Sequence, residues 1–258
     1  MWAVKKEELK IIGGKMKVFA KSDVGKARDM NEDFYYIANN EDFLKLYILA
    51  DGMGGYNGGE IASRLATSSV KSYIESNFNE IEHTKENIAD LIKNAIEYAN
   101  MVVYEKSKES EELENMGTTL EVCLIYNNKA FIGHIGDSRI YRIRKNIIRK
   151  LTQDHSYVQE LVNDGTITKE EAVHHPKKNM LMKALGCTPF IEPDITIKGF
   201  LKDDIIVICS DGLTNMINEQ EIYNIIVQDV TNSSTNLVNR ANELGGYDNI
   251  TVLVIYND

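Results

Sequence analysis

Four aspartates stand at the edges of apolar, strand-like segments of this sequence. They are Asp51 after LKLYILA, Asp137 in GHIGDSR, Asp211 after IIVICS, and Asp248 in the YDN that precedes ITVLVIY. In an antiparallel sheet the end of one strand lies beside the start of its neighbour. We therefore expect these carboxylates to gather at one rim of a sheet.

A further acidic segment, Asn31-Glu32-Asp33, precedes another strand-like run. Several carboxylates at one place repel one another unless cations lie between them. Oxygen ligands without a thiolate suit hard ions such as Mg²⁺ or Mn²⁺. The glycines in DGMGGYNGG after Asp51 would let backbone approach an ion closely, so that a carbonyl can serve as a ligand. The sequence therefore predicts a site for divalent metal ions.

Each of these residues also has a simpler structural interpretation. Asp-Gly is a common turn, and Asp137 could cap its turn by binding backbone amides. The segment GMGGYNGG could grip phosphate, but it lacks the Lys-Ser/Thr ending of a P-loop. His155 in QDHS could be a ligand or a base, although a histidine beside a helix start is more often structural.

The periodicity of the chain predicts the elements that position these residues. Apolar alternation predicts strands over 17–21, 34–37, 44–50, 118–126, 129–135, 139–144, 195–198, 204–209 and 250–256. Helical spacing predicts helices over 59–77, 85–107, 156–163, 169–173, 219–228 and 234–244. Tight turns between successive strands require antiparallel pairing. The order indicates an α+β fold with antiparallel sheets and helices packed outside.

Composition narrows the class of protein. The 258 residues include 29 Lys and Arg against 39 Asp and Glu, a net charge of −10 that disfavours non-specific nucleic-acid binding. No apolar run approaches the ~20 residues of a membrane span, and the N-terminus lacks a secretory signal, so we expect a cytoplasmic protein. Three separated cysteines fit neither a disulfide framework nor a zinc ribbon. We expect an extension over 1–15 and one domain over 16–258, with an insertion of short helices at 156–190.

Seven motifs occur in order along the chain and cover nearly all of it after about residue 16. They are SDVGKARDMNED (22–33), ADGMGG (50–55), MGTTL (116–120), GHIGDSRIY (133–141), LTQDHS (151–156), CSDGLTN (209–215) and YDNITVLV (247–254). In these motifs the chain resembles the PP2C-type, metal-dependent (PPM) protein serine/threonine phosphatases, most closely the compact bacterial members. The resemblance implies a four-layer αββα sandwich with a binuclear Mn²⁺ or Mg²⁺ centre at one edge.

Residue roles follow from the resemblance by position. Asp51 would bridge both ions, Gly52 would offer its backbone carbonyl, and Asp211 and Asp248 would hold one ion. Asp137, together with Asp211, matches the site of a third, weaker ion in bacterial members.

Other matched positions lie around this set. Asp33 would act through bound water with Glu32 beside it, and Arg28 matches the phosphate-binding arginine. Eukaryotic members often carry a histidine after the Asp-Gly as general acid, but here Met53 stands there and cannot donate a proton. Water or another group would then protonate the leaving group. Residues 156–190 match the flap near the substrate.

These residues predict hydrolysis of phosphoserine or phosphothreonine by a metal-bridging water, with Arg28, Asp51 and Asp211 in the catalytic roles. Expected partners are phosphorylated proteins, including a Ser/Thr protein kinase, and we expect a monomer that binds neither nucleic acid nor membrane. One alternative is a serine hydrolase that uses Ser138. The other is a catalytically inactive PP2C-like module with a binding or regulatory role.

Overall fold

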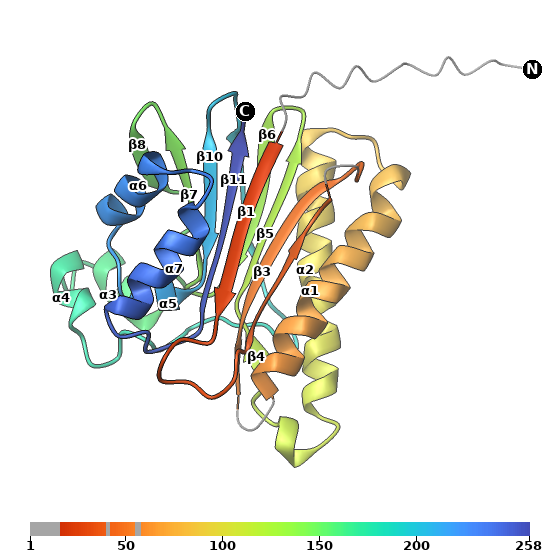
Figure 1. Cartoon of the computed structure of the whole chain (residues 1–258). Helices are drawn as coiled ribbons and strands as arrows, with labels where there is room; N and C mark the ends of the chain where they lie inside the picture. Colours follow the sequence, from red (N-terminus) through yellow and green to blue (C-terminus); the bar gives the residue numbers. More distant parts are fainter. Residues whose placement is uncertain (1–15, 40–41, 55–57) are drawn as a thin grey trace, which may run out of the picture.

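Two antiparallel sheets face each other, and helices cover both outer faces (Figure 1). This arrangement comes from a computed structural model that describes residues 16–39, 42–54 and 58–258. It confirms the α+β fold and the αββα layering predicted from the sequence. The predicted N-terminal extension, 1–15, lies outside the described residues.

The first sheet has the strand order β1-β11-β10-β7-β8. Its strands are β1 (Met16–Asp23), β11 (Ile250–Asn257), β10 (Ile205–Cys209), β7 (Arg139–Arg144) and β8 (Ile147–Lys150). The second sheet has the order β2-β3-β5-β6-β9, with β4 (Gly117–Thr118) paired to β3. Its other strands are β2 (Asp33–Ile37), β3 (Lys45–Met53), β5 (Leu120–Tyr126), β6 (Lys129–Ile135) and β9 (Asp194–Gly199).

Strand β3 shows why its sequence is apolar without alternation. Tyr47 and Leu49 pack between the two sheets, whereas Leu46, Ile48 and Ala50 pack under the helices on the other face. Both faces of the strand are therefore buried, and each position needs an apolar side chain. The strand that ends at the site is thus fixed on both sides by the core.

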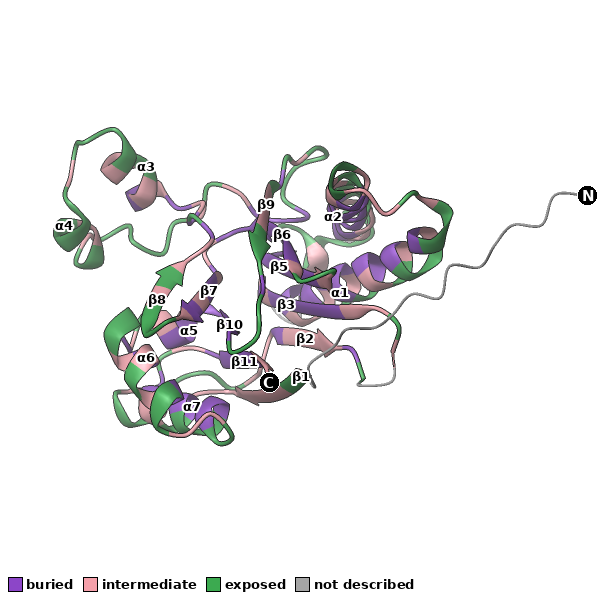
Figure 2. Ribbon diagram, turned by 90° about the horizontal axis from the view of Figure 1, so that it is seen from above, coloured by how far each residue is buried: buried purple, intermediate pink, exposed green. Residues whose placement is uncertain are grey.

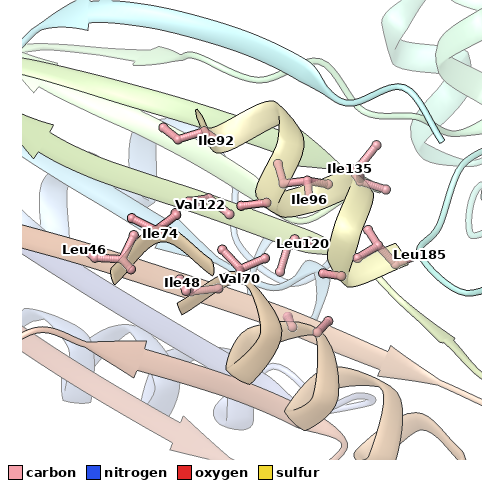
Figure 3. Close-up of a cluster of buried hydrophobic side chains, with 14 of the residues drawn as sticks. Leu46, Ile48, Val70, Ile74, Ile92, Ile96, Leu120, Val122, Ile135 and Leu185 are labelled. Carbon is pink, nitrogen blue, oxygen red and sulfur yellow. The ribbon is translucent and has the colours of Figure 1, made fainter. Parts of the chain in front are cut away.

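Helices α1 (Gly58–Asn77) and α2 (Lys85–Ser107) cover the second sheet. Figure 3 shows Ile74 of α1 and Ile92 of α2 in one apolar cluster with Ile48 and Val122 of the sheet. Burying one such side chain contributes about 1.5–3 kcal/mol. Short 3₁₀ segments, Phe78–Glu80 and Glu111–Leu113, follow the two helices.

On the outer face of the first sheet lie α5 (Asp211–Thr214), α6 (Glu219–Gln228) and α7 (Ser233–Glu243). The helices α3 (Tyr157–Asn163) and α4 (Lys169–Val173) stand away from the sandwich (Figure 2). These two helices belong to the predicted insertion. A β-bridge between Ser156 and Leu181 joins the start of this insertion to a later part of it.

Apart from small shifts in element bounds and two short 3₁₀ segments, the structure departs from the predicted elements in three places. Strand β8 was missed, because its hairpin turn uses Lys145 and Asn146 at φ 48° and 63° rather than glycine. The four-residue helix α5 was missed, because it is too short to show periodicity. The strand predicted over 118–126 is divided at Thr119 into β4 and β5. No helix in the described part of the chain is long and apolar enough to cross a membrane.

Candidate metal centre

The ends of β3 and β10 and the starts of β2 and β11 lie at one edge of the sandwich, the lower edge in Figure 1. Asp33, at the start of β2, lies directly opposite Asp51 in the β2–β3 pairing. Asp211 follows β10, Asp248 precedes β11, and Asp137 lies in the turn between β6 and β7. We call these five side chains the acid rim.

The rim carboxylates lie close enough together to change one another's pKa. Burial raises the pKa of Asp51 well above its usual range, and neighbouring carboxylates raise it further. In order of decreasing effect these belong to Asp33, Asp211, Asp137 and Asp248. The sequence-based expectation that these acids gather is therefore met.

Asp33 is 8% exposed, and hydrogen bonds offset only part of the cost of burying its carboxylate. Burial raises its pKa to about 7, against the opposing hydrogen bonds of Thr251 and Ser210. The Ser210 hydroxyl donates to Asp33 Oδ2 at 2.8 Å. The other oxygen, Oδ1, is buried without a hydrogen-bond partner among the described residues. One oxygen of Asp33 thus remains free to bind a cation or a water.

Asp211 and Asp137 complete one side of the rim. Burial raises the pKa of Asp211 to about 6 and Asp248 adds to the rise, while the Asn215 amide, 2.9 Å from Oδ2, opposes it. Burial likewise raises the pKa of Asp137 to about 8, with Asp211 adding to the effect. Both carboxyls are therefore costly to ionise without an external cation.

The glycines beside Asp51 allow backbone segments to meet. A Cβ on Gly52 would lie 2.1 Å from the carbonyl oxygen of Gly59 and 2.6 Å from that of Glu32. A Cβ on Gly59 would lie 2.4 Å from Glu32 Oε1. This oxygen has no hydrogen-bond partner within the described ranges, and burial raises the pKa of Glu32. Only glycine permits this approach of β3 and α1 to the Glu32 carboxylate.

Arg28 pairs with Asp248 through two contacts, 2.9 Å from Nε to Oδ1 and 3.0 Å from Nη2 to Oδ2. The Arg28 side chain is 51% exposed, so its remaining donors face solvent beside the rim. Asn249 holds the loop that carries Arg28. Its side chain accepts from the Glu32 amide and donates to the carbonyls of Val24 and Met30, each at 2.9 Å.

The donor chemistry of the rim fits a hard divalent cation. All of its side-chain donors are carboxylate oxygens, and buried oxygens of Glu32 and Asp33 have no partner among the described residues. Within residues 16–39, 42–54 and 58–258, no group of three or more His, Cys, Asp or Glu is arranged to hold an ion as it stands. Instead Asp33, Asp211 and Asp248 bond to protein donors.

Two residues that hold the site in place were not found from the sequence: Ser210 and Asn249. Ser210 lies in the motif CSDGLTN, but its contact to Asp33 depends on a segment 177 positions away in the chain. Asn249 follows Asp248, and its side chain bonds to residues more than 200 positions away. The available sequence signal was an Asn directly after Asp248 in the motif YDNITVLV.

The geometry does not support a serine nucleophile. Ser138 is fully buried, and its Oγ lies 2.9 Å from Thr119 Oγ1. His155 accepts from the Gly136 amide through Nδ1 at 3.1 Å, and its ring stacks on His134 at 4.6 Å. Both residues have structural roles, as the simpler interpretation of His155 predicted.

An αββα sandwich with partly buried carboxylates gathered at one rim is the arrangement expected of a metal-dependent phosphatase. A model of the protein phosphatase 2C family matches residues 26–245, and the chain belongs to this family. It is 36% identical over 240 residues to the serine/threonine phosphatase stp of Listeria monocytogenes, covering 92% of this chain and 94% of that protein.

Solved structures agree with this assignment. The serine/threonine phosphatase PstP/Ppp of Mycobacterium tuberculosis superposes with a TM-score of 0.84 at 32% identity, covering 94% of this chain and 99% of that chain. The catalytic domain of the phosphatase PstP, solved in complex with two manganese ions, gives a TM-score of 0.81 at 32% identity. It covers 93% of this chain and 97% of that chain.

Proposed function

We infer that this chain is a metal-dependent protein serine/threonine phosphatase that hydrolyses phosphoserine and phosphothreonine esters. The observation that carries this conclusion is the acid rim, where burial and four other carboxylates raise the pKa of Asp51. A relative solved with two manganese ions supports the same type of centre. The required cofactors are two Mn²⁺ or Mg²⁺ ions, with a third, weaker one beside Asp137.

The rim residues would divide the ligation as follows. Asp51 would bridge two ions, with the Gly52 carbonyl beside it, and Asp211 and Asp248 would hold one of them. Asp33 would act through water, with Glu32 nearby. When bound, two divalent ions supply a water of lowered pKa, oriented for in-line attack on phosphorus. The core on both faces of β3 keeps Asp51 rigid, so little reorganisation is needed when an ion binds.

Arg28 is the residue best placed to bind the phosphate. Its guanidinium already makes a two-pronged contact to Asp248 at 2.9 and 3.0 Å, and its other donors face solvent. A guanidinium matches phosphate oxygens in the same forked geometry and offsets negative charge in the transition state. Asp248 would thus both orient Arg28 and bind an ion.

We also propose the identity of the partners and of the active unit. A Ser/Thr protein kinase is an expected partner, since such phosphatases oppose one, and the monomer is the expected active form in the cytoplasm. Residues 16–258 are expected to carry the activity. Deleting 1–15 should therefore leave turnover of a phosphothreonine peptide unchanged.

The test is turnover of p-nitrophenyl phosphate and of a phosphothreonine peptide by the purified chain. We expect EDTA to abolish activity, Mn²⁺ to restore it, and Asp211→Asn to remove it. Asp203→Asn, an exposed substitution, is the matched control and should leave activity unchanged. Activity that survives EDTA and is lost to a fluorophosphonate would favour the serine hydrolase. An Asp211→Asn variant as active as the wild type would revive the non-catalytic module.

A further inference from the structure

The motif MGTTL has no role in the mechanism above, yet it lies between two parts of the acid rim. Thr119 separates β4 from β5 and is 2% exposed. Its backbone amide donates to the Asp51 carbonyl at 2.9 Å, and the Asp51 amide donates back to Thr119 Oγ1 at 3.0 Å. Thr119 therefore fixes the backbone of Asp51 on both sides.

The same hydroxyl also reaches the turn that carries Asp137. Thr119 Oγ1 lies 2.9 Å from Ser138 Oγ, and both groups are buried. Gly136 lies against Thr119, and a Cβ there would come within 2.6 Å of the threonine side chain. Gly136 also has a φ of 110°, which disfavours any other residue. The turn is therefore packed directly onto Thr119.

A second clamp holds the opposite side of this turn. The His155 amide donates to the Gly136 carbonyl at 2.7 Å, and the Gly136 amide donates to His155 Nδ1 at 3.1 Å. Neither of these contacts, one between backbone groups and one to the His155 ring, involves the hydroxyl of Ser138. Removing that hydroxyl should therefore leave the turn folded while loosening its attachment to Asp51.

We propose that Thr119 and Ser138 are positioning residues that set the separation of the Asp51 and Asp137 carboxylates through one shared hydrogen bond. The inference rests on the proposed function, because it concerns an ion held beside Asp137. Neither residue touches substrate or ion. Their effect falls on the weakest ion, because Asp51 keeps its other strand contacts when the link is cut.

The experiment is calorimetric titration of Mn²⁺ into the metal-free chain and into Ser138→Ala. We expect the weakest binding event to lose about five-fold in affinity, the typical effect of losing one hydrogen bond, while tighter events are unchanged. Ser107→Ala is the matched control, since it removes another buried hydroxyl, one that donates to the Tyr104 carbonyl at 2.7 Å. Wild-type binding in Ser138→Ala would overturn the proposal.

A second pair of variants separates positioning from general stability. Thr119→Val removes the hydroxyl at constant shape, and Thr119→Ser keeps it. We expect Thr119→Val to weaken the weakest Mn²⁺ event and Thr119→Ser to restore it. In the metal-free chain, urea unfolding of Thr119→Val, Ser138→Ala and the double variant should show non-additive effects. Additive effects would contradict the link. A wild-type chain that binds no Mn²⁺ would instead refute the proposed function itself.

Discussion

Two sets of aspartates in this chain, each wholly or partly buried, differ in what surrounds them. Asp154 is 9% exposed and Asp33 is 8% exposed, so their burial is nearly equal. Burial alone would raise the pKa of Asp154, but Arg139 and Lys150 outweigh it and hold that pKa below its usual range. The pKa of Asp33 instead rises to about 7, because burial dominates and Asp211 and Asp248 are negative neighbours.

This difference shows which buried carboxylates the fold pairs with its own arginine and lysine side chains. Arg139 donates to Asp154 Oδ2 at 2.7 and 3.1 Å and to Oδ1 at 3.1 Å, and Lys150 adds a contact to Oδ1 at 3.1 Å. Asp204 is similarly paired with Arg144 and also accepts the Leu201 amide at 2.6 Å. In the acid rim, only Asp248 has an arginine partner of this kind among the described residues. Carboxylates left together in this way suit an external cation.

The largest effect should come from Asp51→Asn. Asp51 lies at the centre of the acid rim, so its loss should remove Mn²⁺ binding and lower kcat/KM by more than about a hundred-fold, since changes to residues merely behind metal ligands already cost up to that much. Steady-state kinetics with p-nitrophenyl phosphate would measure this. An Asp51→Asn variant that retained a tenth of wild-type turnover would contradict the assignment.

The same substitution should have different effects on the free energy of unfolding in the two sets. Asp154→Asn leaves Arg139 and Lys150 without their buried partner and should lower the free energy of unfolding by about 3 kcal/mol. Asp33→Asn removes a repelled carboxyl and should leave the metal-free chain equally or more stable. Urea denaturation in EDTA measures both. Equal losses in the two variants would show that the comparison is mistaken.

The pH dependence sharpens the comparison further. Asp137 and Asp33 have pKa values raised to about 8 and about 7 from 3.8, so the folded state binds protons that the unfolded state releases. Stability of the metal-free chain is therefore lost as pH rises through these values, by about 1–3 kcal/mol between pH of about 6.5 and about 8.5. His155, with its pKa lowered to about 4, stays neutral in this window.

Urea midpoints of the metal-free chain across this pH range would measure the effect. Asp137→Asn should reduce the slope, because it removes one of the titrating groups. Saturating Mn²⁺ should reduce it as well, since bound ions keep the carboxylates ionised. A metal-free chain that became more stable as the pH rose would show that the pKa values of the rim carboxyls are not raised.

A smaller effect is expected from Arg28→Lys. Lysine keeps the charge but loses the forked contact to Asp248 and to phosphate, so KM should rise about ten-fold. The metal-free stability should hardly change, since the pair is partly exposed and such pairs contribute about 1 kcal/mol or less. Kinetics with a phosphothreonine peptide would test this. An unchanged KM would show that Arg28 does not bind the phosphate of the substrate.

Periodicity predicted most of the fold because the long elements bury regular apolar faces. The bounds predicted for α2, α4, α6, β6 and β7 match the structure, and the other predicted bounds differ by a few residues. Asn127 and Asn128, expected to form a hairpin, have φ of 47° and 56°. Short elements such as α5 and β8 were missed, because their formation depends on neighbours in space.

The acids of the site were predictable because each stands at a strand edge, but their partners were not. The pair formed by Arg28 and Asp248 spans 220 positions in the sequence. The contact between Ser210 and Asp33 spans 177. Such contacts depend on how the two sheets stack, which local patterns do not encode.

The most direct test is a crystal grown with Mn²⁺ and measured at the manganese absorption edge. We predict two strong anomalous peaks about 2.1 Å from the Asp51 carboxylate oxygens, with Asp211 and Asp248 bound to one of them. A third, weaker peak should lie beside Asp137. Rim side chains that point apart, with no anomalous density among them, would contradict the account.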